Sequence, residues 1–533
     1  MKTTRRRFVQ GGVAAATLIS APSIARAQSA PTAARTLKCV MQGDLRSFDP
    51  IWTTANITAY HGAMIYDMLF GVDADNKPQP QMVESFAPSD DRLSWTFKLR
   101  DGLKFSDGSP VTSADCIASM RRWAVRDSAG QHMFERVKDT SAKDDRTFVI
   151  SLKERYPLIL DAMAKPGTPD LFIMRKKDAE TDPMQQIKEF VGSGPFIFNQ
   201  DATKMGASYV YDRNPNYVPR KEAPSGLSGG KVVKLDRVIW DNIADEQTAM
   251  AALQAGEIDF MELPPLDLID QLESDANITV EVLNPTGNVG FMRLNFLYPP
   301  FDNKKARQAM LYLVNQSDVM KSTFGSGKYW KKCDSLFGIG TSMENHENTE
   351  WFKEAPNIPK AQALFKEAGY DGRPVILLQA SNFAFMNNAP QLVAQWLQQA
   401  GVNAQLATSD WGGVVTRRAN REPPDKGGWN TFTTFSSTSN IASPINFIGH
   451  VANGDKSWFG WPKDETNEML RDKWAKAEPD DRLAVAKEMQ RNAWDFVPTV
   501  YMGQWTSPAA WRKNVKGFVK VPEIIPFWNV EKT

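Results

Sequence analysis

Patterns typical of short strands and of amphipathic helices alternate along most of this chain, and this order constrains the fold more than any other feature. Apolar and polar residues alternate at 93–99 and 147–152, as they do in strands with one buried face. Further strands are predicted at 36–41 and 232–239, and helices at 56–70, 112–125, 247–255, 304–315, 359–368, 390–400 and 482–495. This alternation favours an α/β fold with open sheets over a barrel or a helix bundle.

Several of these segments carry recognisable end signals. Thr112 is suited to cap the helix that follows it, and Asp115 provides an acidic form of the capping box three residues later. Gly256 stands where a helix needs a residue that readily adopts a left-handed conformation. Clusters of glycine and proline at 219–230 and 423–428 predict loops.

The chain is too long for a single hydrophobic core. Its 533 residues suggest two to four domains, and its 16 tryptophans and 29 phenylalanines supply much apolar area for their cores. The three cysteines, Cys39, Cys116 and Cys333, allow at most one disulfide, and three buried thiols are the alternative interpretation.

The first 27 residues have the three parts of an export signal. Residues 5–8 read Arg-Arg-Arg-Phe, a weakly apolar segment runs over 11–21, and residues 25–27 read Ala-Arg-Ala, a small-residue cleavage site. The paired arginines predict recognition by the twin-arginine export machinery. We expect cleavage near Ala27–Gln28 and a mature protein in the bacterial periplasm.

The charge balance gives no reason to expect nucleic acid or an anionic membrane as a partner. The chain has 63 basic and 62 acidic residues, and loss of the signal removes five basic residues and no acid, which leaves a net charge near −4. No run of 18 apolar residues follows the signal, so no membrane span is predicted.

Motifs of enzyme and metal sites are weak. The four histidines, His61, His132, His346 and His450, form neither a His-Glu-x-x-His motif nor a close pair, and no Cys-x-x-Cys occurs. Residues 325–328 read Gly-Ser-Gly-Lys but lack the other residues of a phosphate loop, so a surface turn is predicted. We therefore predict a protein that is not an enzyme and holds no metal or cofactor. An exported hydrolase with unrecognised catalytic residues is the alternative from a different class.

Six strings of residues agree in order and spacing with one protein family. They lie at 47–50 together with 66–70, and at 95–115, 192–196, 213–217, 252–259 and 300–309. They resemble the family-5 extracellular solute-binding proteins, which are the peptide, nickel and related binding proteins of ABC importers. The string at 98–110 also reads as strands joined by Asp-Gly turns, which predicts scaffold rather than ligand contacts.

The resemblance implies a periplasmic-binding-protein-like α/β fold, with two lobes built from three domains and a two-strand hinge. Domain I would comprise 36–72, 193–283 and 501–533, domain II 73–192, and domain III, the opposite lobe, 284–500. Ligand would be enclosed by lobe closure about hinge strands, for which 282–288 and 497–503 are the candidates. The resemblance also implies a small-molecule or peptide ligand and the permease subunits of an ABC transporter as partners. We expect a monomer.

The segment 426–454 departs from the peptide-binding relatives. These carry an aspartate shortly after a Gly-Trp pair, where it binds the α-ammonium of the peptide, whereas no acid follows Gly428-Trp429 here before residue 455. The segment suits a neutral or anionic ligand, unless an acid such as Asp410 replaces the clamp; a plain Ser/Thr-rich loop is the other interpretation. A di- or oligopeptide remains the leading ligand class. An opine, a sugar-like solute and, with only His450 nearby, a nickel complex are the alternatives.

We expect the ligand site to combine tryptophan rings, which stack on sugar rings or cover apolar side chains, with a few polar groups. The four tryptophans chosen follow segments that should border the cleft, although each alone is also compatible with a hydrophobic core. The predicted ligand-binding residues are Trp52, Trp411, Trp429, Thr434, Gln504 and Trp505.

Overall fold

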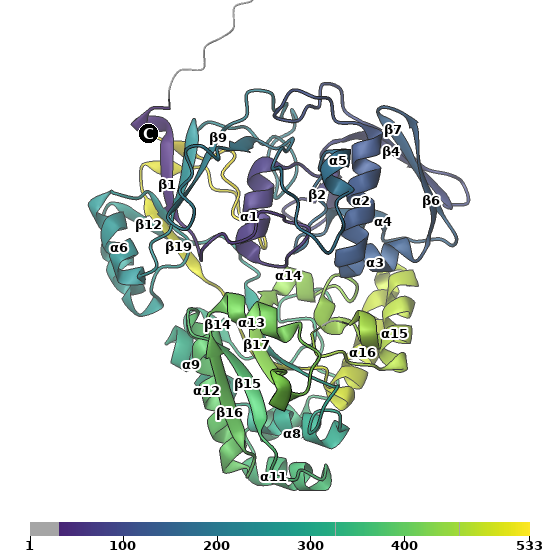
Figure 1. The fold of residues 1–533 in the computed structure, drawn as a ribbon, viewed down its shortest axis with the longest axis vertical. Coiled ribbons are helices and arrows are strands. Elements are labelled where there is room, and N and C mark those ends of the chain that lie inside the picture. Colours follow the sequence, from purple (N-terminus) through teal and green to yellow (C-terminus); the bar gives the residue numbers. More distant parts are fainter. Residues whose placement is uncertain (1–30, 326, 458) are drawn as a thin grey trace, which may run out of the picture.

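The computed structural model describes residues 31–325, 327–457 and 459–533, so the predicted signal at 1–27 and its cleavage site lie outside the described residues. The described chain forms two lobes, which are the upper and lower halves of Figure 1. A seven-stranded and a four-stranded sheet build the upper lobe, and a six-stranded sheet builds the lower one. Within the described residues, no helix is both long and apolar enough to cross a membrane.

The seven-stranded sheet has the strand order β12-β19-β11-β1-β10-β9-β8. Its central strand β1 runs parallel to both neighbours, and Leu37 and Cys39 are fully buried, as expected for a strand inside a core. The strands are β1 (Thr36–Val40), β8 (Phe196–Phe198), β9 (Ser208–Arg213), β10 (Arg237–Asp241), β11 (Phe260–Met261), β12 (Ile278–Val282) and β19 (Pro508–Arg512). The helices of this part are α1 (Asn56–Ile65), α6 (Glu246–Ala255) and α7 (Ile269–Ser274).

A smaller antiparallel sheet, in the order β4-β5-β7-β6, completes the upper lobe. The predicted capping box is confirmed, because the Asp115 carboxylate accepts a hydrogen bond from the Thr112 N–H at 2.7 Å and the Thr112 hydroxyl accepts one from the Asp115 N–H. The strands are β4 (Val83–Pro88), β5 (Ser94–Leu99), β6 (Val137–Asp144) and β7 (Thr147–Leu152), and the helices are α2 (Ser113–Arg126), α3 (Ser128–Phe134), α4 (Ile159–Ala164) and α5 (Lys176–Ala179). Two short pairs, β2 (Phe70–Val72) with β3 (Pro78–Pro80) and β20 (Val515–Lys516) with β21 (Glu531–Lys532), lie outside the large sheets.

The six-stranded sheet of the lower lobe has the order β14-β18-β13-β17-β15-β16. The hydroxyl-rich segment after Trp429 is strand β17 in the interior of this sheet, so its interpretation as a loop is wrong. The strands are β13 (Asn288–Leu294), β14 (Trp330–Lys331), β15 (Val375–Ala380), β16 (Ala404–Ser409), β17 (Thr431–Ser437) and β18 (Thr499–Trp505). The helices are α8 (Lys304–Leu313), α9 (Gln316–Phe324), α10 (Glu350–Glu354), α11 (Ile358–Glu367), α12 (Ala384–Gln399), α13 (Trp411–Arg418), α14 (Thr438–Ile441), α15 (Glu465–Lys476) and α16 (Arg482–Phe496).

The chain passes between the two large sheets at 283–287 and again at 506–507. The second passage follows β18, which stays in the lower sheet up to Trp505, a few residues beyond the predicted boundary at 500/501. The passages lie side by side. Gly287 has a φ of +68°, and a Cβ there would stand 2.1 Å from the Trp505 carbonyl oxygen, so only glycine permits this approach.

Some predicted elements have different ends in the structure. The helix predicted at 56–70 ends at Ile65, because Tyr66 is extended, and the strand predicted at 232–239 is β10, which starts five residues later. The helix predicted at 390–400 starts at Ala384, since Pro390 lies within it instead of opening it. All three cysteines are buried thiols, so the disulfide alternative is wrong.

Candidate functional site

A cavity of about 850 Å³ lies between the two lobes. The upper lobe lines it within 41–46, 242–246, 262–266 and 521–525, and the lower lobe lines it within 321–325 and 382–386 and at Asp410. Several of these segments directly follow parallel strands, namely β1, β10 and β11 above and β15 and β16 below. The carboxyl ends of parallel strands are the usual place for ligand sites in open α/β sheets, so the cavity is the candidate site.

Aromatic rings form one wall of the cavity, here named the aromatic wall and consisting of Phe324, Phe385, Phe435 and Trp505. The Trp505 ring centroid lies 4.8 Å from those of Phe324 and Phe385 and 5.4 Å from that of Phe435. Gly290 in β13 makes room for them, because a Cβ there would lie 2.3 Å from the Phe385 ring and 2.9 Å from the Trp505 ring. The wall offers an apolar surface for a ligand side chain or ring.

Glu262 follows β11 and lines the cavity although it is only 6 % exposed. One carboxylate oxygen accepts a hydrogen bond from the Gln42 N–H at 2.8 Å, and the other accepts from the Tyr60 hydroxyl at 2.9 Å and the Gln42 amide at 3.1 Å. Burial raises the pKa of Glu262 to about 7, because the charged form loses water that these hydrogen bonds replace only in part.

Glu523, in the C-terminal segment, lines the same cavity and is 9 % exposed. One carboxylate oxygen accepts a hydrogen bond from the Ser437 N–H of β17 at 3.2 Å, so this contact joins the two lobes. Burial, and after it the nearby Asp170, raises the pKa of Glu523 to about 7. Glu523 also has a φ of +68°, a conformation that costs energy outside glycine and therefore has to be held by its surroundings.

Arg46 and Asp410 form an ion pair across the cavity, with 2.7 Å between the guanidinium and the carboxylate. Their side chains are 61 % and 43 % exposed, so the pair is worth at most about 1 kcal/mol. Asp410 also caps helix α13 by accepting a hydrogen bond from the Gly413 N–H at 2.8 Å. Asp410 was the acid that could replace the missing aspartate of the peptide-binding relatives. Its carboxylate is already engaged in an ion pair and in a helix cap.

Three of the predicted ligand-binding residues, all in the lower lobe, have different surroundings. Trp505 lines the cavity, as the prediction requires. Gln504, one residue earlier, is buried and holds a loop, because its amide oxygen accepts from the Ile339 N–H at 2.8 Å and its amide nitrogen donates to the Ile339 carbonyl at 3.0 Å. Trp429 is fully buried against Phe432 and Trp461 and does not line the cavity, so the structure places it in the core of the lower lobe.

The other three predicted residues are also outside the cavity lining. Trp52 donates its indole N–H to the Met184 carbonyl at 3.1 Å and so packs within the upper lobe. Trp411 directly follows Asp410. The Arg418 guanidinium lies over its ring, 5.2 Å from the ring centroid. Thr434 precedes Phe435 in β17, and because neighbouring strand residues face opposite sides of a sheet, the phenylalanine reaches the cavity and the threonine does not.

Sequence reasoning missed the two buried glutamates and the three phenylalanines of the aromatic wall. A usable signal existed for Glu262, because an acid directly after a short strand of an open sheet is well placed to reach a ligand. The polar turn at 42–44 after β1, visible in the sequence, is part of the cavity lining. We find no sequence signal for Glu523, whose position depends on the path of an irregular C-terminal segment.

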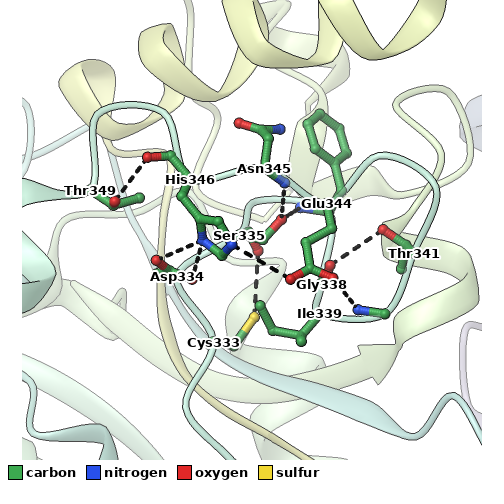
Figure 2. Close-up of polar contacts among 12 residues, drawn as sticks. Cys333, Asp334, Ser335, Gly338, Ile339, Thr341, Glu344, Asn345, His346 and Thr349 are labelled. Atoms are coloured by element: carbon green, nitrogen blue, oxygen red, sulfur yellow. Dashed lines mark hydrogen bonds and ion pairs between the residues drawn. The ribbon is translucent and has the colours of Figure 1, made fainter.

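The loop held by Gln504 contains a compact polar network, shown in Figure 2. His346 contacts Asp334 at 3.0 Å through Nδ1 and Glu344 at 3.6 Å through Nε2, and its carbonyl accepts from the Thr349 hydroxyl at 2.9 Å. Among the described residues, no group of three or more His, Cys, Asp or Glu side chains is arranged to hold a metal ion. These contacts join neighbouring residues of the loop, which Gln504 of β18 holds through Ile339.

A Gly-x-Ser-x-Gly string at 226–230 bears on the hydrolase alternative. Such a string activates serine only at a strained turn from a strand into a helix. Here it lies between β9 and β10 in a loop without either element, and the Ser228 hydroxyl donates to the Ser225 carbonyl at 2.8 Å. The string is therefore a tight turn rather than a nucleophile elbow.

Comparison with known sequences gives a consistent family. The profile of the bacterial extracellular solute-binding proteins, family 5 Middle, matches residues 77–455. A probable peptide ABC transporter periplasmic-binding protein of Sinorhizobium fredii is 48 % identical over 100 % of both chains. The glutathione-binding protein of Escherichia coli K12 is 25 % identical over 92 % of this chain and 93 % of its own.

Solved structures share the two-lobed fold. The periplasmic binding protein AgaA of A. tumefaciens R10, in complex with agropinic acid, superposes with a TM-score of 0.79 at 22 % identity, over 93 % of this chain and 99 % of its own. The murein tripeptide binding protein MppA of Escherichia coli gives a TM-score of 0.79 at 17 % identity, over 94 % and 99 %. The fold is thus that of the periplasmic binding proteins, and the family profile covers most of the chain. The protein belongs to the bacterial extracellular solute-binding proteins of family 5.

Proposed function

We propose that this protein captures a peptide in the cavity between its lobes and delivers it to the permease of an ABC transporter. The observation that carries the proposal is the cavity itself, which has about 850 Å³, an apolar aromatic wall and buried carboxylates from the opposite lobe. This size lies within the range of small-molecule sites. The Sinorhizobium relative, whose name describes a probable peptide-binding protein, supports the same assignment.

The test is to identify what the protein carries. Protein purified from its natural host would be denatured, and the released solutes would be analysed by mass spectrometry. Peptides in stoichiometric amount support the proposal, and calorimetry with the same peptides then gives the affinity. Stoichiometric release of a non-peptide solute would contradict it. The complex of AgaA with agropinic acid makes an opine the second candidate, which the same experiment detects.

Capture is expected to involve rotation of the lobes about the paired passages at 283–287 and 506–507. Solution scattering should then give a smaller radius of gyration when the identified peptide is present at saturation. Secondary structure should stay the same. An unchanged radius would remove the closure mechanism and leave binding in place.

Export by the twin-arginine pathway to the periplasm is part of the proposal, because residues 5–8 carry the arginine pair. Changing Arg5 and Arg6 together to lysine should abolish the periplasmic form. Undiminished periplasmic protein in that variant, or in a strain without the pathway, would indicate ordinary Sec export. We further propose that the protein is not an enzyme, so the purified protein should release no product from peptides or esters.

A further inference from the structure

Two buried carboxylates face the cavity without a counter-ion. Glu262 and Glu523 are both more than nine-tenths buried, and among the described residues no lysine, arginine or histidine forms an ion pair with either. Both line the same cavity as Tyr60, whose hydroxyl donates to Glu262 at 2.9 Å and whose pKa is raised by burial first and then by these two acids. The contacts of the Glu523 carboxylate come from the Ser437 N–H at 3.2 Å and from the Ser437 side chain, and neither donor carries a charge.

The surroundings of Glu523 do not supply the missing charge. Lys165 lowers the pKa of Glu523, but it is itself buried and already paired with Asp127 at 2.9 Å. Asp170 is also fully buried, and its like charge raises the pKa of Glu523. One of its carboxylate oxygens has no hydrogen-bond partner among the described residues. The buried carboxyls of Glu523, Asp170 and Asp127 therefore share the single ammonium of Lys165. This leaves this side of the cavity short of positive charge.

We propose that Glu523 and Glu262 form a cation-binding subsite, which takes a protonated amine or a guanidinium of the bound ligand. This inference rests on the peptide-binding function proposed above and names the chemical group that the cavity selects. The subsite belongs to the upper lobe, opposite the strand β17 in which an acid is absent. The carboxylates of Glu523 and Glu262 and the Tyr60 hydroxyl all line the cavity and provide hydrogen-bond acceptors for such a group.

The probe is a peptide mixture obtained from casein with glutamyl endopeptidase, offered to protein that has been unfolded, washed and refolded. Retained peptides are quantified by mass spectrometry. Three digests are compared: one unmodified, one from casein whose lysines were acetylated before digestion, and one acetylated at every amine after digestion. If peptides are no longer retained from the second digest, the subsite binds the side-chain ammonium of lysine. If they are lost only from the third digest, it binds the α-ammonium. From the third digest, only arginine-containing peptides should be retained; retention of peptides without any cation would overturn the proposal.

Glu523→Gln and Glu262→Gln should each reduce retention from the unmodified digest by about tenfold or more, because each removes one charge that pairs with the buried cation. Using both variants guards against one of them failing to fold. Glu531→Gln is the matched control, since Glu531 lies in the same C-terminal segment, pairs with Lys234 at 3.2 Å and is outside the cavity lining. Equal retention by all four proteins would overturn the subsite and leave the peptide function standing.

Failure of the peptide function has a different signature, namely that the wild type retains nothing from the unmodified digest. The subsite is then decided by thermal shift with L-arginine, agmatine and spermidine. A shift in the wild type that is absent in Glu523→Gln supports a cation subsite for another ligand class. No difference between the two proteins would overturn it.

Discussion

The charges are arranged in opposite ways at two of the places where the lobes meet. Besides the cavity, the upper lobe touches the lower one where α3 and the β6–β7 sheet approach α15 (Figure 1). We name this contact the rim network; it consists of Glu135, Arg136 and Glu154 from the upper lobe and Lys456, Asp472 and Lys476 from the lower lobe. Its three acids and three bases balance one another.

The rim network is also mostly exposed. Lys476 lies 3.5 Å from Glu154 across the lobes and 2.9 Å from Asp472 in its own helix, and all three side chains are more than one-third exposed. Glu262 and Glu523, by contrast, are buried and have no cation of their own among the described residues. The rim can therefore close without a ligand, whereas the cavity reaches charge balance only when a ligand brings a cation. Specificity is expected in the cavity, and the rim should contribute little to it.

The largest expected effect is a loss of stability, and the peptide retention that accompanies it distinguishes a residue of the cavity wall from a residue of the core. Trp505→Ala and Trp429→Ala should each lower the free energy of unfolding by about 3–5 kcal/mol, the usual loss for a buried large aromatic side chain. Urea denaturation measures this loss. Only Trp505→Ala should also reduce peptide retention, since Trp429 does not reach the cavity. Weakened binding in a folded Trp429→Ala protein would return that residue to the site.

The next effect is a pH dependence caused by the buried glutamates. The pKa of Glu523 is raised to about 7 in the folded protein by burial, from 4.5 for a glutamate in water, so the folded state binds the proton more tightly. Its contribution to stability is fully present below pH 4.5 and is lost as the pH rises through 7. Above pH 7 Glu523→Gln should therefore be more stable than the ligand-free wild type, by at most about 3 kcal/mol.

Urea midpoints of the two proteins at pH 4, 6 and 8 test this dependence, because the groups that face Glu523, namely Tyr60, Asp170 and Lys165, are the same in both. The difference should be smallest at pH 4 and largest at pH 8. A bound cationic peptide should remove it by raising the stability of the wild type alone. A constant difference at all three pH values would show that Glu523 does not titrate in this range.

A smaller effect is expected at the rim network. Lys476→Ala removes one contact across the lobes, but exposed ion pairs are typically worth less than about 1 kcal/mol. The unfolding free energy should change by no more than this, and peptide affinity by less than about fivefold. Calorimetry with the peptide identified from the natural host measures the affinity. A larger loss of binding would mean that the rim holds the closed form.

The smallest effect is expected for Arg46→Ala. The Arg46–Asp410 pair joins the lobes at the cavity itself, yet both side chains are highly exposed, so its loss should change stability by about 0.5 kcal/mol or less. The variant also removes one of the positive charges at the cavity. Because the Glu523 and Glu262 subsite has no cation of its own among the described residues, affinity for a cationic peptide should stay equal or rise slightly; a marked loss would instead assign Arg46 to the peptide carboxylate.

The fold was largely predictable from the sequence, and the site was not. Local patterns such as Thr112 with Asp115, or Gly256 at a helix end, act through neighbouring residues and are readable one segment at a time. The cavity brings together residues more than 200 positions apart, as in the contact between Glu262 and Tyr60. Of the six predicted residues only Trp505 lines it, because a tryptophan near a cleft segment is equally suited to the core, as Trp429 illustrates.

The close approach of Gly287 to the Trp505 carbonyl has a mechanical consequence. A single strand between two bodies permits bending in two directions and twisting about its own axis. Two strands held in contact along one line remove the twist and the sideways bend, and leave rotation about that line as the soft degree of freedom. Each approach of the lobes then presents the aromatic wall to Glu523 and Glu262 in the same alignment. Any side chain at position 287 would separate the two strands and would again permit twisting and sideways bending.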